Sequence, residues 1–508
     1  GPNWSNRGDN AFHVLYASQL EETAVLDGLT IYGGSAAPAS SFFQRYGGAI
    51  TSSLSNFVVR DCTFTGNSAA EGGGALYLSN SNAVFQRCHF LENKAKGGGA
   101  IHLESDKPLF IESEFRHNVA DINGGAVSGL GEGEFQNCTF IENHAGGCGG
   151  AVNVDGGHLL LTNSLLIGNS ATKGGALCNE SWPYDTQMVG CTLSQNTASI
   201  GSAVYDYTYT NIDARLSVSN SILWGNFGTP TIAIEDSHNR PRIRFSCVQG
   251  GWSFSDSINN IAVDPGFVDP LGPDHTPGNG DGNFRLTAGS PCIDAGISLH
   301  LPSDSGDLDG DGIVLEPIPV GLDHNPRIVD QMAVPDTGQG FGPRIDMGAY
   351  EFLDDCNGNH VNDLFEIKSG TAVDCDGNGV PDQCQADCNA DSIADSCEIE
   401  DGISEDCNLN GRMDLCDLAA EVATDCNHNN RLDECELTLG TSFDCNTTGL
   451  LDECDLEAGT SLDCDGNGMP DECEPDCNGN DGTDACDIRD GTSKDCNANH
   501  VPDECDIR

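Results

Sequence analysis

The chain has 508 residues, and its 79 Asp and Glu outnumber its 22 Lys and Arg, which gives a formal net charge of −57. A surface of that sign repels nucleic acid and anionic membranes, so we expect neither as a partner. No apolar run reaches the roughly 18 residues that a membrane-spanning helix needs, and no membrane span is predicted. The 63 Gly residues follow no collagen-like period and favour an all-β or repeat architecture over helical bundles.

Residues 1–240 contain an internal repeat. A Gly-Gly-Ala phrase recurs every 25 to 27 residues, with its Ala at Ala49, Ala75, Ala100, Ala126, Ala151, Ala176 and Ala203. An Asn ladder keeps step with it at Asn67, Asn93, Asn118, Asn143, Asn169, Asn196 and Asn226. A Cys/Ser ladder does the same at Cys62, Cys88, Ser113, Cys138, Ser164, Cys191 and Ser221. Short apolar runs cut by Gly and Asn predict strands of about three to five residues, stacked about 4.8 Å apart in a parallel β-solenoid.

Each ladder has an expected place in that solenoid. Phe and Leu near the Cys/Ser ladder should stack inside, and the Asn ladder should lie at turns with left-handed backbone conformation. The Gly pair should form a tight corner before the inward Ala. Because Ser113 and Ser164 occupy the same ladder as Cys62, Cys88, Cys138 and Cys191, we interpret these cysteines as small buried thiols without disulfides.

The phrases Gly47-Gly48-Ala49-Ile50 and Asn137-Cys138-Thr139-Phe140 resemble those of right-handed parallel β-helix proteins of bacterial surfaces. The resemblance covers residues 24 to about 240. It implies the fold and leaves the function open, since such proteins include pectate-lyase-like enzymes, adhesins and surface spacers.

Residues 241–353, the capping module, contain Ser290-Pro291-Cys292-Ile293-Asp294-Ala295-Gly296 and resemble the terminal module of bacterial β-helix surface proteins. We expect the module to cover the open edge of the solenoid, which would otherwise template aggregation. A disulfide between Cys247 and Cys292 is predicted. The run Asp307-Leu308-Asp309-Gly310-Asp311-Gly312 is either a cation-binding loop or a solvated acidic turn.

Residues 355–508, the tail, contain nine copies of a twelve-residue phrase that start at Asp355, Asp374, Asp387, Asp406, Asp425, Asp444, Asp463, Asp476 and Asp495. Successive copies start 19 residues apart, except for a step of 13 after Asp374 and after Asp463. Asp or Asn occupies loop positions 1, 3, 5 and 9, and an acid usually occupies position 12. With a backbone carbonyl at position 7, such a loop offers the six to eight oxygens that calcium prefers.

The tail therefore predicts a calcium-binding array. Its candidate ligands are, copy by copy, Asp355, Asn357, Asn359, Asp363 and Glu366; Asp374, Asp376, Asn378 and Asp382; Asp387, Asn389, Asp391, Asp395 and Glu398; Asp406, Asn408, Asn410, Asp414 and Asp417; Asp425, Asn427, Asn429, Asp433 and Glu436; Asp444, Asn446, Asp452 and Asp455; Asp463, Asp465, Asn467, Asp471 and Glu474; Asp476, Asn478, Asn480, Asp484 and Asp487; and Asp495, Asn497, Asn499, Asp503 and Asp506. The second and sixth copies are the weakest, because Gln385 stands at position 12 of one and Thr448 at position 5 of the other.

The loops resemble thrombospondin type 3 repeats and, more loosely, dockerin loops; the ending Thr483-Asp484-Ala485-Cys486-Asp487 carries the first resemblance. Linkers such as Leu437 to Ser442 should form at most one helical turn closed by Gly. With so little apolar material, metal and disulfides must substitute for a core.

Of the 25 Cys, 17 lie in the tail, which implies an oxidising, extracellular compartment. Each copy has Cys at positions 2 and 11, except that the first has Phe365. Pairing within copies leaves only Cys356 over, whereas joining each copy to the start of the next leaves Cys356, Cys375 and Cys505. We favour pairing within copies.

The sequence thus predicts an all-β chain: a right-handed parallel β-helix (1–240), a capping module (241–353) and a calcium- and disulfide-stabilised repeat rod (355–508). The favoured function is that of an extracellular structural or adhesive surface protein, compatible with a homo-oligomer or filament and with a cell-surface polysaccharide or protein as ligand. One alternative is a polysaccharide lyase or hydrolase that uses loop residues such as Asp155, Asp185, Asp206, Asp213 and Arg215. Another is a dockerin-like connector. No acid pair recurs at a spacing that defines a catalytic site, so we predict no enzyme.

Overall fold

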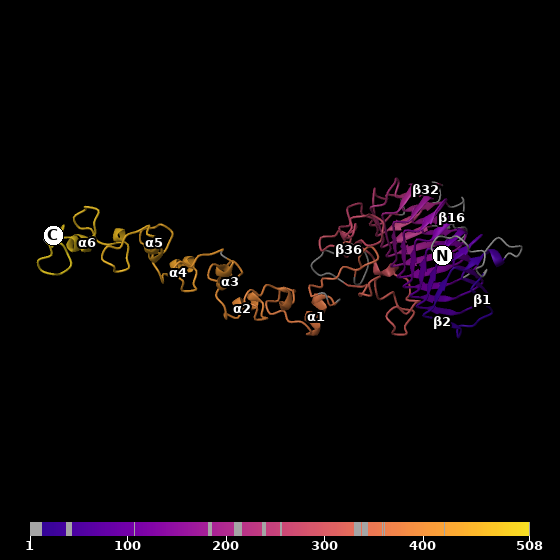
Figure 1. Cartoon of the computed structure of the whole chain (residues 1–508), viewed down its shortest axis with the longest axis horizontal. Helices are drawn as coiled ribbons and strands as arrows, with labels where there is room; N and C mark the ends of the chain where they lie inside the picture. Colours follow the sequence, from indigo (N-terminus) through magenta and orange to yellow (C-terminus); the bar gives the residue numbers. More distant parts are fainter. Residues whose placement is uncertain are drawn as a thin grey trace. The chain divides into compact units, whose positions relative to one another are not determined.

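The computed structural model describes residues 13–36, 43–105, 107–180, 185–207, 216–235, 240–254, 257–329, 337, 344–357, 359, 361–420 and 422–506. The chain divides into two compact units, Gly1–Leu353 and Asp354–Arg508, and each is described by itself. Figure 1 shows stacked strands in the first unit and a succession of short helices in the second.

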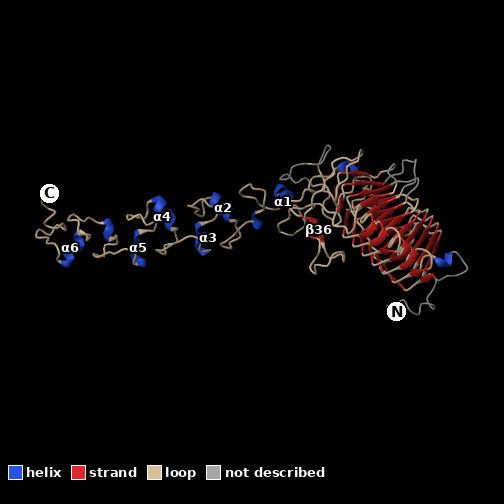
Figure 2. Cartoon of the chain, turned by 90° about the horizontal axis from the view of Figure 1, so that it is seen from above, coloured by secondary structure: helices blue, strands red, loops and turns tan. Residues whose placement is uncertain are grey.

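The first unit is built on a parallel β-solenoid with four sheets (Figures 1 and 2). The first sheet contains β1 (Leu15–Ser18), β5 (Ile50–Ser53), β9 (Leu76–Ser79), β13 (Ile101–Glu104), β17 (Val127–Gly129), β21 (Val152–Val154), β25 (Leu177–Asn179), β29 (Val204–Asp206) and β32 (Ile232–Ile234). The second contains β2 (Val25–Asp27), β6 (Val58–Arg60), β10 (Val84–Gln86), β14 (Leu109–Ile111), β18 (Gly133–Gln136), β22 (Leu159–Thr162), β26 (Thr186–Val189), β30 (Leu216–Ser219) and β33 (Arg242–Arg244).

The third sheet contains β3 (Thr30–Tyr32), β7 (Thr63–Thr65), β11 (His89–Leu91), β15 (Glu114–Arg116), β19 (Thr139–Ile141), β23 (Leu165–Ile167), β27 (Thr192–Ser194), β31 (Ile222–Leu223) and β34 (Cys247–Val248). The fourth contains β4 (Ser35–Ala36), β8 (Ser68–Ala69), β12 (Lys94–Gly97), β16 (Val119–Asn123), β20 (His144–Ala145), β24 (Ser170–Lys173) and β28 (Thr197–Ile200). A 3-10 turn, η1 (Phe43–Arg45), precedes β5. The predicted fold class is confirmed, and β33 and β34 carry the coils past residue 240.

The core repeats one environment from coil to coil. Phe90 stacks on Phe115 and Phe115 on Phe140, with ring centroids 4.8 and 4.6 Å apart. Phe85, Phe110 and Phe135 form a second stack, with 4.7 Å between consecutive rings. These side chains are fully buried, and burying each one stabilises the fold by about 2–3 kcal/mol. The expected interior position of the Phe residues is confirmed.

The Asn ladder is a continuous chain of buried hydrogen bonds. Oδ1 of Asn143 accepts both the backbone N–H and the Nδ2 of Asn118, at 3.0 and 2.9 Å. Nδ2 of Asn143 donates to the Phe115 carbonyl and to Oδ1 of Asn169, at 2.9 and 3.0 Å. The expected turn with a left-handed residue is confirmed, and the left-handed residue is the one before the Asn, with φ 53° at Glu142 for example. That residue makes the turn, which leaves the Asn amide free to bond inside it.

The Gly pair meets two different constraints. Gly98, the first of its pair, has φ +57°. A Cβ on Gly99, the second, would lie 2.1 Å from the Gly125 carbonyl oxygen of the next coil. The corner therefore needs Gly for its backbone conformation and again for the close approach of coils. The predicted buried thiols are confirmed, since Cys62, Cys88, Cys138 and Cys191 are free and fully buried.

The capping module packs along the side of the solenoid as well as over its end. Asn137 Nδ2 donates to the Gly321 carbonyl at 2.7 Å, and Asn220 exchanges two hydrogen bonds with Ile297. The module contains the antiparallel pair β35 (Phe267–Asp269) and β36 (Asn283–Leu286) and a 3-10 turn, η2 (Ser298–His300). The predicted Cys247–Cys292 disulfide was wrong: both are free thiols in one apolar cluster, and Cys247 Sγ donates instead to the Val263 carbonyl.

The second unit has only short helices, as expected. They are α1 (Asp363–Ser369), η3 (Asp382–Cys384), α2 (Asp395–Glu400), α3 (Asp414–Ala419), α4 (Asp433–Leu439), α5 (Asp452–Ala458), η4 (Asp471–Cys473) and α6 (Asp484–Asp490). Each helix begins at loop position 9, so the linker adds only residues 437–439 to α4 before Gly440 closes the helix, as predicted. Where one residue separates copies, as at Ala386 and Pro475, the chain leaves room for only a 3-10 turn.

No helix among the described residues is both long and apolar enough to cross a membrane.

Asn143→Ala should destabilise the solenoid by at least about 2 kcal/mol, because it leaves two buried donors of Asn118 without their acceptor. His144→Ala, an exposed neighbour, should change stability by less than about 0.5 kcal/mol. Urea unfolding followed by circular dichroism measures both. Equal stability of the two variants would contradict the structural role of the ladder.

Stability of the first unit should fall as pH rises, because burial raises the pKa of Asp206 from 3.8 to about 7. The folded state then keeps a proton that the unfolded state has lost, so this contribution is present below about pH 4 and is lost as pH rises through about 7. Asp206→Asn keeps the acceptor for Asn179 and cannot ionise. Between pH 5 and pH 8 the variant should gain about 2 kcal/mol relative to the wild type. Thermal unfolding at the two pH values tests this, and a pH-independent difference would refute it.

Candidate metal centre

Every copy of the tail phrase folds into the same loop. In the fifth copy the backbone N–H of Asn429 donates to Oδ1 of Asp425 at 3.0 Å, and that of Asn430 donates to Oδ2 at 2.8 Å. The N–H of Arg431 donates to Oδ1 of Asn429 at 2.8 Å. The bond from position 5 to position 1 recurs in all nine copies. Positions 1 and 5 therefore face the inside of one turn.

Position 12 joins this set from the helix that follows. Nδ2 of Asn427 and Nδ2 of Asn429 donate to the two carboxylate oxygens of Glu436, at 3.0 and 2.8 Å. Six of the position-12 acids are buried, namely Glu366, Glu398, Asp417, Glu436, Asp455 and Asp487. Positions 1, 3, 5 and 12, all predicted as ligands, are thus brought together as a ring of oxygen-bearing side chains. We call this set the ring.

The ring fits a hard divalent cation. Asp417 in the fourth copy is 0% exposed, yet its Oδ1 accepts no hydrogen bond from any described residue. The nearest cationic group is Arg412, with Nε at 3.7 Å. A buried carboxylate oxygen without a hydrogen bond is costly, and a bound cation would remove that cost. The oxygen-only donor set matches calcium rather than a softer transition metal.

The two weak copies fill the ring with neutral side chains. Thr448 Oγ1 donates to Oδ2 of Asp455 at 2.7 Å, in the place that an Asn amide takes in other copies. Gln385 Nε2 donates to the carbonyl of Val380, the position-7 oxygen, at 3.1 Å. Both substitutes occupy the expected place and bring no negative charge.

Position 9 has another task. Oδ1 of Asp433 accepts the backbone N–H of Cys426 at 3.0 Å, and the Asp433 N–H donates to the Thr424 carbonyl at 2.9 Å. Both bonds recur in all nine copies. Burial raises the pKa of the position-9 acids Asp363 and Asp414. The position-9 carboxylate therefore closes the base of the loop and is hydrogen-bonded outside the ring.

Groups such as Cys388, Asp395 and Cys416 bring three potential ligand atoms within 4.8 Å of one another, and such groups could hold a metal. The two sulfurs of this group form a disulfide, so they carry no thiolate charge and only the carboxylate remains as a strong donor. The ring is the richer oxygen site.

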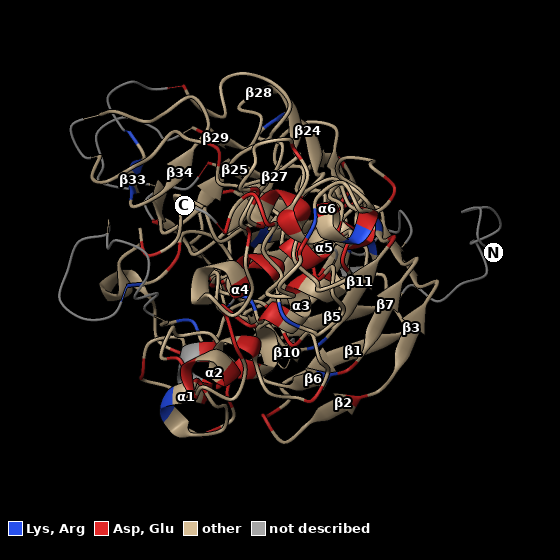
Figure 3. Ribbon diagram, turned by 90° about the vertical axis from the view of Figure 1, so that its left-hand side faces the viewer, with Lys and Arg blue, Asp and Glu red and all other residues tan. Residues whose placement is uncertain are grey.

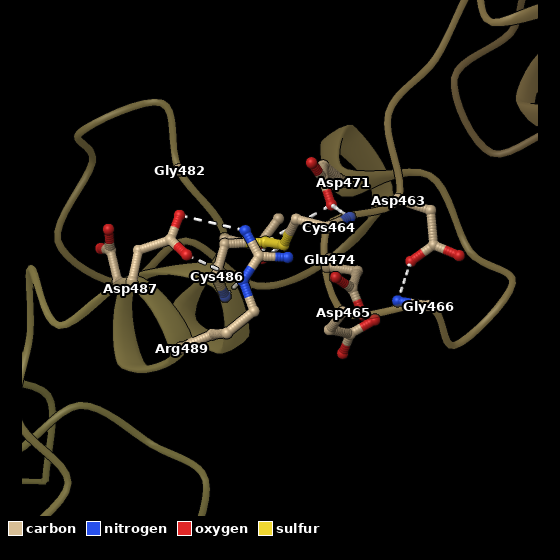
Figure 4. The surroundings of a disulfide bond; sticks show 12 residues. Asp463, Cys464, Asp465, Gly466, Asp471, Glu474, Gly482, Cys486, Asp487 and Arg489 are labelled. Carbon is tan, nitrogen blue, oxygen red and sulfur yellow. Dashed lines mark hydrogen bonds and ion pairs between the residues drawn. A yellow bond between two sulfur atoms is a disulfide. The ribbon is translucent and has the colours of Figure 1, made fainter.

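Disulfides join consecutive copies, so the predicted pairing within copies was wrong. The position-2 Cys of each copy bonds to the position-11 Cys of the next, in the pairs Cys356–Cys384, Cys375–Cys397, Cys388–Cys416, Cys407–Cys435, Cys426–Cys454, Cys445–Cys473, Cys464–Cys486 and Cys477–Cys505. Cys496 is free and exposed. Within a loop, position 2 instead binds the position-9 carboxylate through its N–H. Figure 4 shows Cys464–Cys486 with Asp471 beside the sulfurs, while Asp465 and Glu474 lie together in the ring.

A further disulfide, Cys148–Cys178, links neighbouring coils of the solenoid with Cα atoms 5.6 Å apart. Sequence reasoning missed it because the two residues occupy different registers of the repeat.

Position 10 brings an acid from one copy to the ring of the copy before it. Nδ2 of Asn408 donates to Glu434 at 2.9 Å, and Nδ2 of Asn446 donates to Glu472 at 3.0 Å. Asn427 makes the equivalent bond to Glu453. Hydrogen bonds from Ser493 and Asn478 lower the pKa of Glu504, which places it at the eighth ring. Sequence reasoning missed these acids because they lie 26 residues from the side chains they contact.

The acids at position 10 complement those at positions 3 and 5. The fourth, fifth, sixth and eighth copies have no acid at positions 3 and 5, and the copy after each supplies Glu434, Glu453, Glu472 or Glu504. The second, third and seventh copies do have such an acid, and the copies after them supply Ser396, Leu415 and Ala485. The first copy, followed by Gln383, is the exception. In six copies three carboxylates therefore surround the ring.

Position 8 of the loop is a packing position that sequence reasoning also missed. Its residue is buried in most copies, as at Ala394, Met413, Leu432 and Leu451. An apolar residue before Asp at a constant register could have identified this packing position from the sequence.

The loop acids of the enzyme hypothesis have varied settings. Asp155 is exposed and lines a groove of about 340 Å³ with Tyr46 and His102. Asp185 is exposed, whereas Asp206 is buried and accepts a hydrogen bond from Asn179 at 2.6 Å. Asp213 and Arg215 lie outside the described residues.

The family described as right handed beta helix region matches residues 5–166, so the solenoid is a right-handed parallel β-helix. A search of curated proteins found no match. Asp and Glu residues colour much of the ribbon of the tail helices in Figure 3, whereas Lys and Arg residues are few there. The disulfides indicate folding in an oxidising, extracellular environment.

Digestion of the unreduced protein should release peptides that join consecutive copies, Cys426 with Cys454 for example. Cys496 should react with an alkylating reagent without reduction, because it is exposed and free. Mass spectrometry of the linked peptides gives the pairing directly. Recovery of a Cys426–Cys435 link would contradict the structure.

Proposed function

We propose that this chain is an extracellular structural or adhesive surface protein whose β-helix is borne on a tail stiffened by calcium. The observation that carries the proposal is the double connection between consecutive loops. A disulfide ties each of the first eight copies to the next, and in four of them a Glu at position 10 of the next copy also reaches the ring. A cation held at one ring would thus fasten two copies.

The chain's own residues supply what such a site needs. The carboxylates at positions 1 and 12 would hold the ion from opposite sides of the loop, with the side-chain oxygens of positions 3 and 5 between them. Calcium would supply positive charge that the tail lacks, since its 40 acids face only 6 Lys and Arg. The Asn amides that now donate to position 12 would turn their oxygens toward the ion. Neutralised rings would let neighbouring copies pack without repulsion.

A single mechanical role accounts for both units. A parallel solenoid is long, repetitive and rigid because each coil bonds to the next along its whole length. A tail whose rings fill with calcium outside the cell would act as a stiff stalk for that solenoid. Low calcium would loosen the joints between copies and leave the disulfides as flexible tethers.

Calcium should slow hydrogen exchange of the tail loops in the intact protein, by about tenfold or more relative to chelator, because ion binding fixes the ring. Glu472→Gln should raise the calcium concentration for half-protection of residues 444–455 by about tenfold, since the sixth ring then keeps two acids. Exchange measured by mass spectrometry against calcium concentration resolves the individual loops.

The matched control is Glu457→Gln, which removes an exposed acid of α5, the helix of the sixth copy itself, and should leave the sixth loop unchanged. Loops that exchange equally fast in calcium and in chelator would refute the proposed function. A normal calcium response in Glu472→Gln would refute the part assigned to position 10 alone.

A further inference from the structure

The capping module contains a loop, Asp304 to Glu316, whose bonding repeats that of the tail loops. We call it the cap loop. The N–H of Gly312 donates to Oδ1 of Asp307 at 2.9 Å, as position 6 donates to position 1 in the tail. The N–H of Asp311 donates to Asp309, and that of Ile313 donates to Asp311, at 3.2 and 2.7 Å. Asp307, Asp309 and Asp311 thus stand where tail positions 1, 3 and 5 stand.

Two acids that the sequence did not associate with this run complete the cluster. Asp304 is 0% exposed, and its Oδ1 accepts no hydrogen bond from any described residue. Its Oδ2 accepts the N–H of Leu308 at 2.8 Å, which holds the side chain under the turn. Glu316 returns to the same place because the Asp304 N–H donates to its carbonyl at 2.8 Å. One buried oxygen of Glu316 also lacks a hydrogen bond among the described residues.

Among the described residues, no Lys or Arg neutralises these acids. Within the described part of the chain, none of the five carboxylates makes an ion pair with Lys or Arg. Two buried carboxylate oxygens without hydrogen bonds, facing three further acids, form an unstable arrangement unless a cation lies among them.

We propose that the cap loop is a calcium site formed by Asp304, Asp307, Asp309, Asp311 and Glu316, separate from the tail array. Five carboxylates and a backbone carbonyl give at least six oxygens, the number and type that calcium takes. Magnesium demands a stricter octahedron and keeps several waters, so a cluster of five acids favours calcium. The sequence left two alternatives for this run, a cation-binding loop and a solvated acidic turn. On this proposal the run is a solvated turn only when no ion is bound.

The site has a structural consequence for the first unit. The base of the cap loop is bonded to β18, where Gln136 Nε2 donates to Ser305 Oγ at 2.7 Å and Ser305 donates to Glu134 at 2.7 Å. A Cβ on Gly306 would lie 2.3 Å from Gln136 Oε1, so the loop sits directly on the solenoid. Calcium in the cap loop would therefore fasten the capping module to the side of the β-helix.

The decisive variant is Asp304→Asn in the full-length chain. Without calcium it relieves a buried charge, so the melting temperature of the solenoid should equal or exceed that of the wild type in chelator. In excess calcium the order should reverse, because the variant loses a ligand. A residue with only a packing role would lower the melting temperature in both conditions, and that result would overturn the proposal.

Local exchange separates this site from the tail. In wild type, calcium should slow exchange at residues 310–313 by tenfold or more. Asp309→Asn, an exposed change, should abolish that response while the tail loops respond as before. Asp264→Asn, an exposed acid of the same module that accepts the Gly266 N–H, is the matched control and should leave the response intact.

The outcomes distinguish the two calcium proposals. A tail that responds to calcium with a cap loop that does not would overturn this inference and leave the proposed function standing. A cap loop that responds while the tail does not would support the inference and refute the stiffened tail. Slowing by magnesium at equal concentration would overturn the assignment to calcium.

Discussion

Bonding between consecutive copies holds both units of this protein, because neither one coil nor one loop buries enough apolar surface to be stable alone. In the solenoid the Asn side-chain amides connect the coils. Each amide accepts a hydrogen bond from the coil before it and donates one to the coil after it. In the tail a disulfide connects consecutive copies, and in several copies a carboxylate at position 10 adds a second connection. Connections between consecutive copies thus support a dry, close-packed interior in the solenoid and open, charged loops in the tail.

Charge is managed differently in the two units. The solenoid keeps its interior almost free of acids, and Asp206 is an exception whose raised pKa shows what burial costs. In the tail, by contrast, most of the acids at positions 9 and 12 are buried. Position 9 is satisfied by backbone N–H groups, so its negative charge is stabilised locally. Among the described residues, position 12 accepts hydrogen bonds only from neutral side-chain donors, Asn amides and Ser or Thr hydroxyls, and a divalent cation would neutralise its charge.

The distribution of acids around the rings follows a rule that single loops do not reveal. A ring with Asp at position 3 or 5 receives no acid from its neighbour, and most rings without one receive a Glu. Three carboxylates then surround the ring in six copies, enough to attract a divalent ion. Fewer would weaken binding, and more would strain the loop when no ion is bound. The cap loop, with five acids, lies on a folded surface that can hold such a concentration in place.

The sequence by itself determined the solenoid, because four residue types in one period can be satisfied only by stacked, equivalent coils. The Phe stacks, the buried thiols and the Gly corners all followed from it. The same reasoning identified the loop frame of the tail, since position 1 at Asp425 and position 12 at Glu436 are set by local bonds within twelve residues. Contacts between residues close in the chain can be predicted from the spacing of residue types in the sequence.

Only the tertiary structure decided which copies are joined. Spacing favoured Cys426 with Cys435 because they are nearest in the chain, yet Cys454 is the partner once the copies are packed. Glu453 and Asn427 meet for the same reason, although 26 residues separate them. These contacts join residues whose separation depends on how linkers turn and modules dock. The spacing of residues along the chain does not predict these contacts, because several conformations of the linker are compatible with the same spacing.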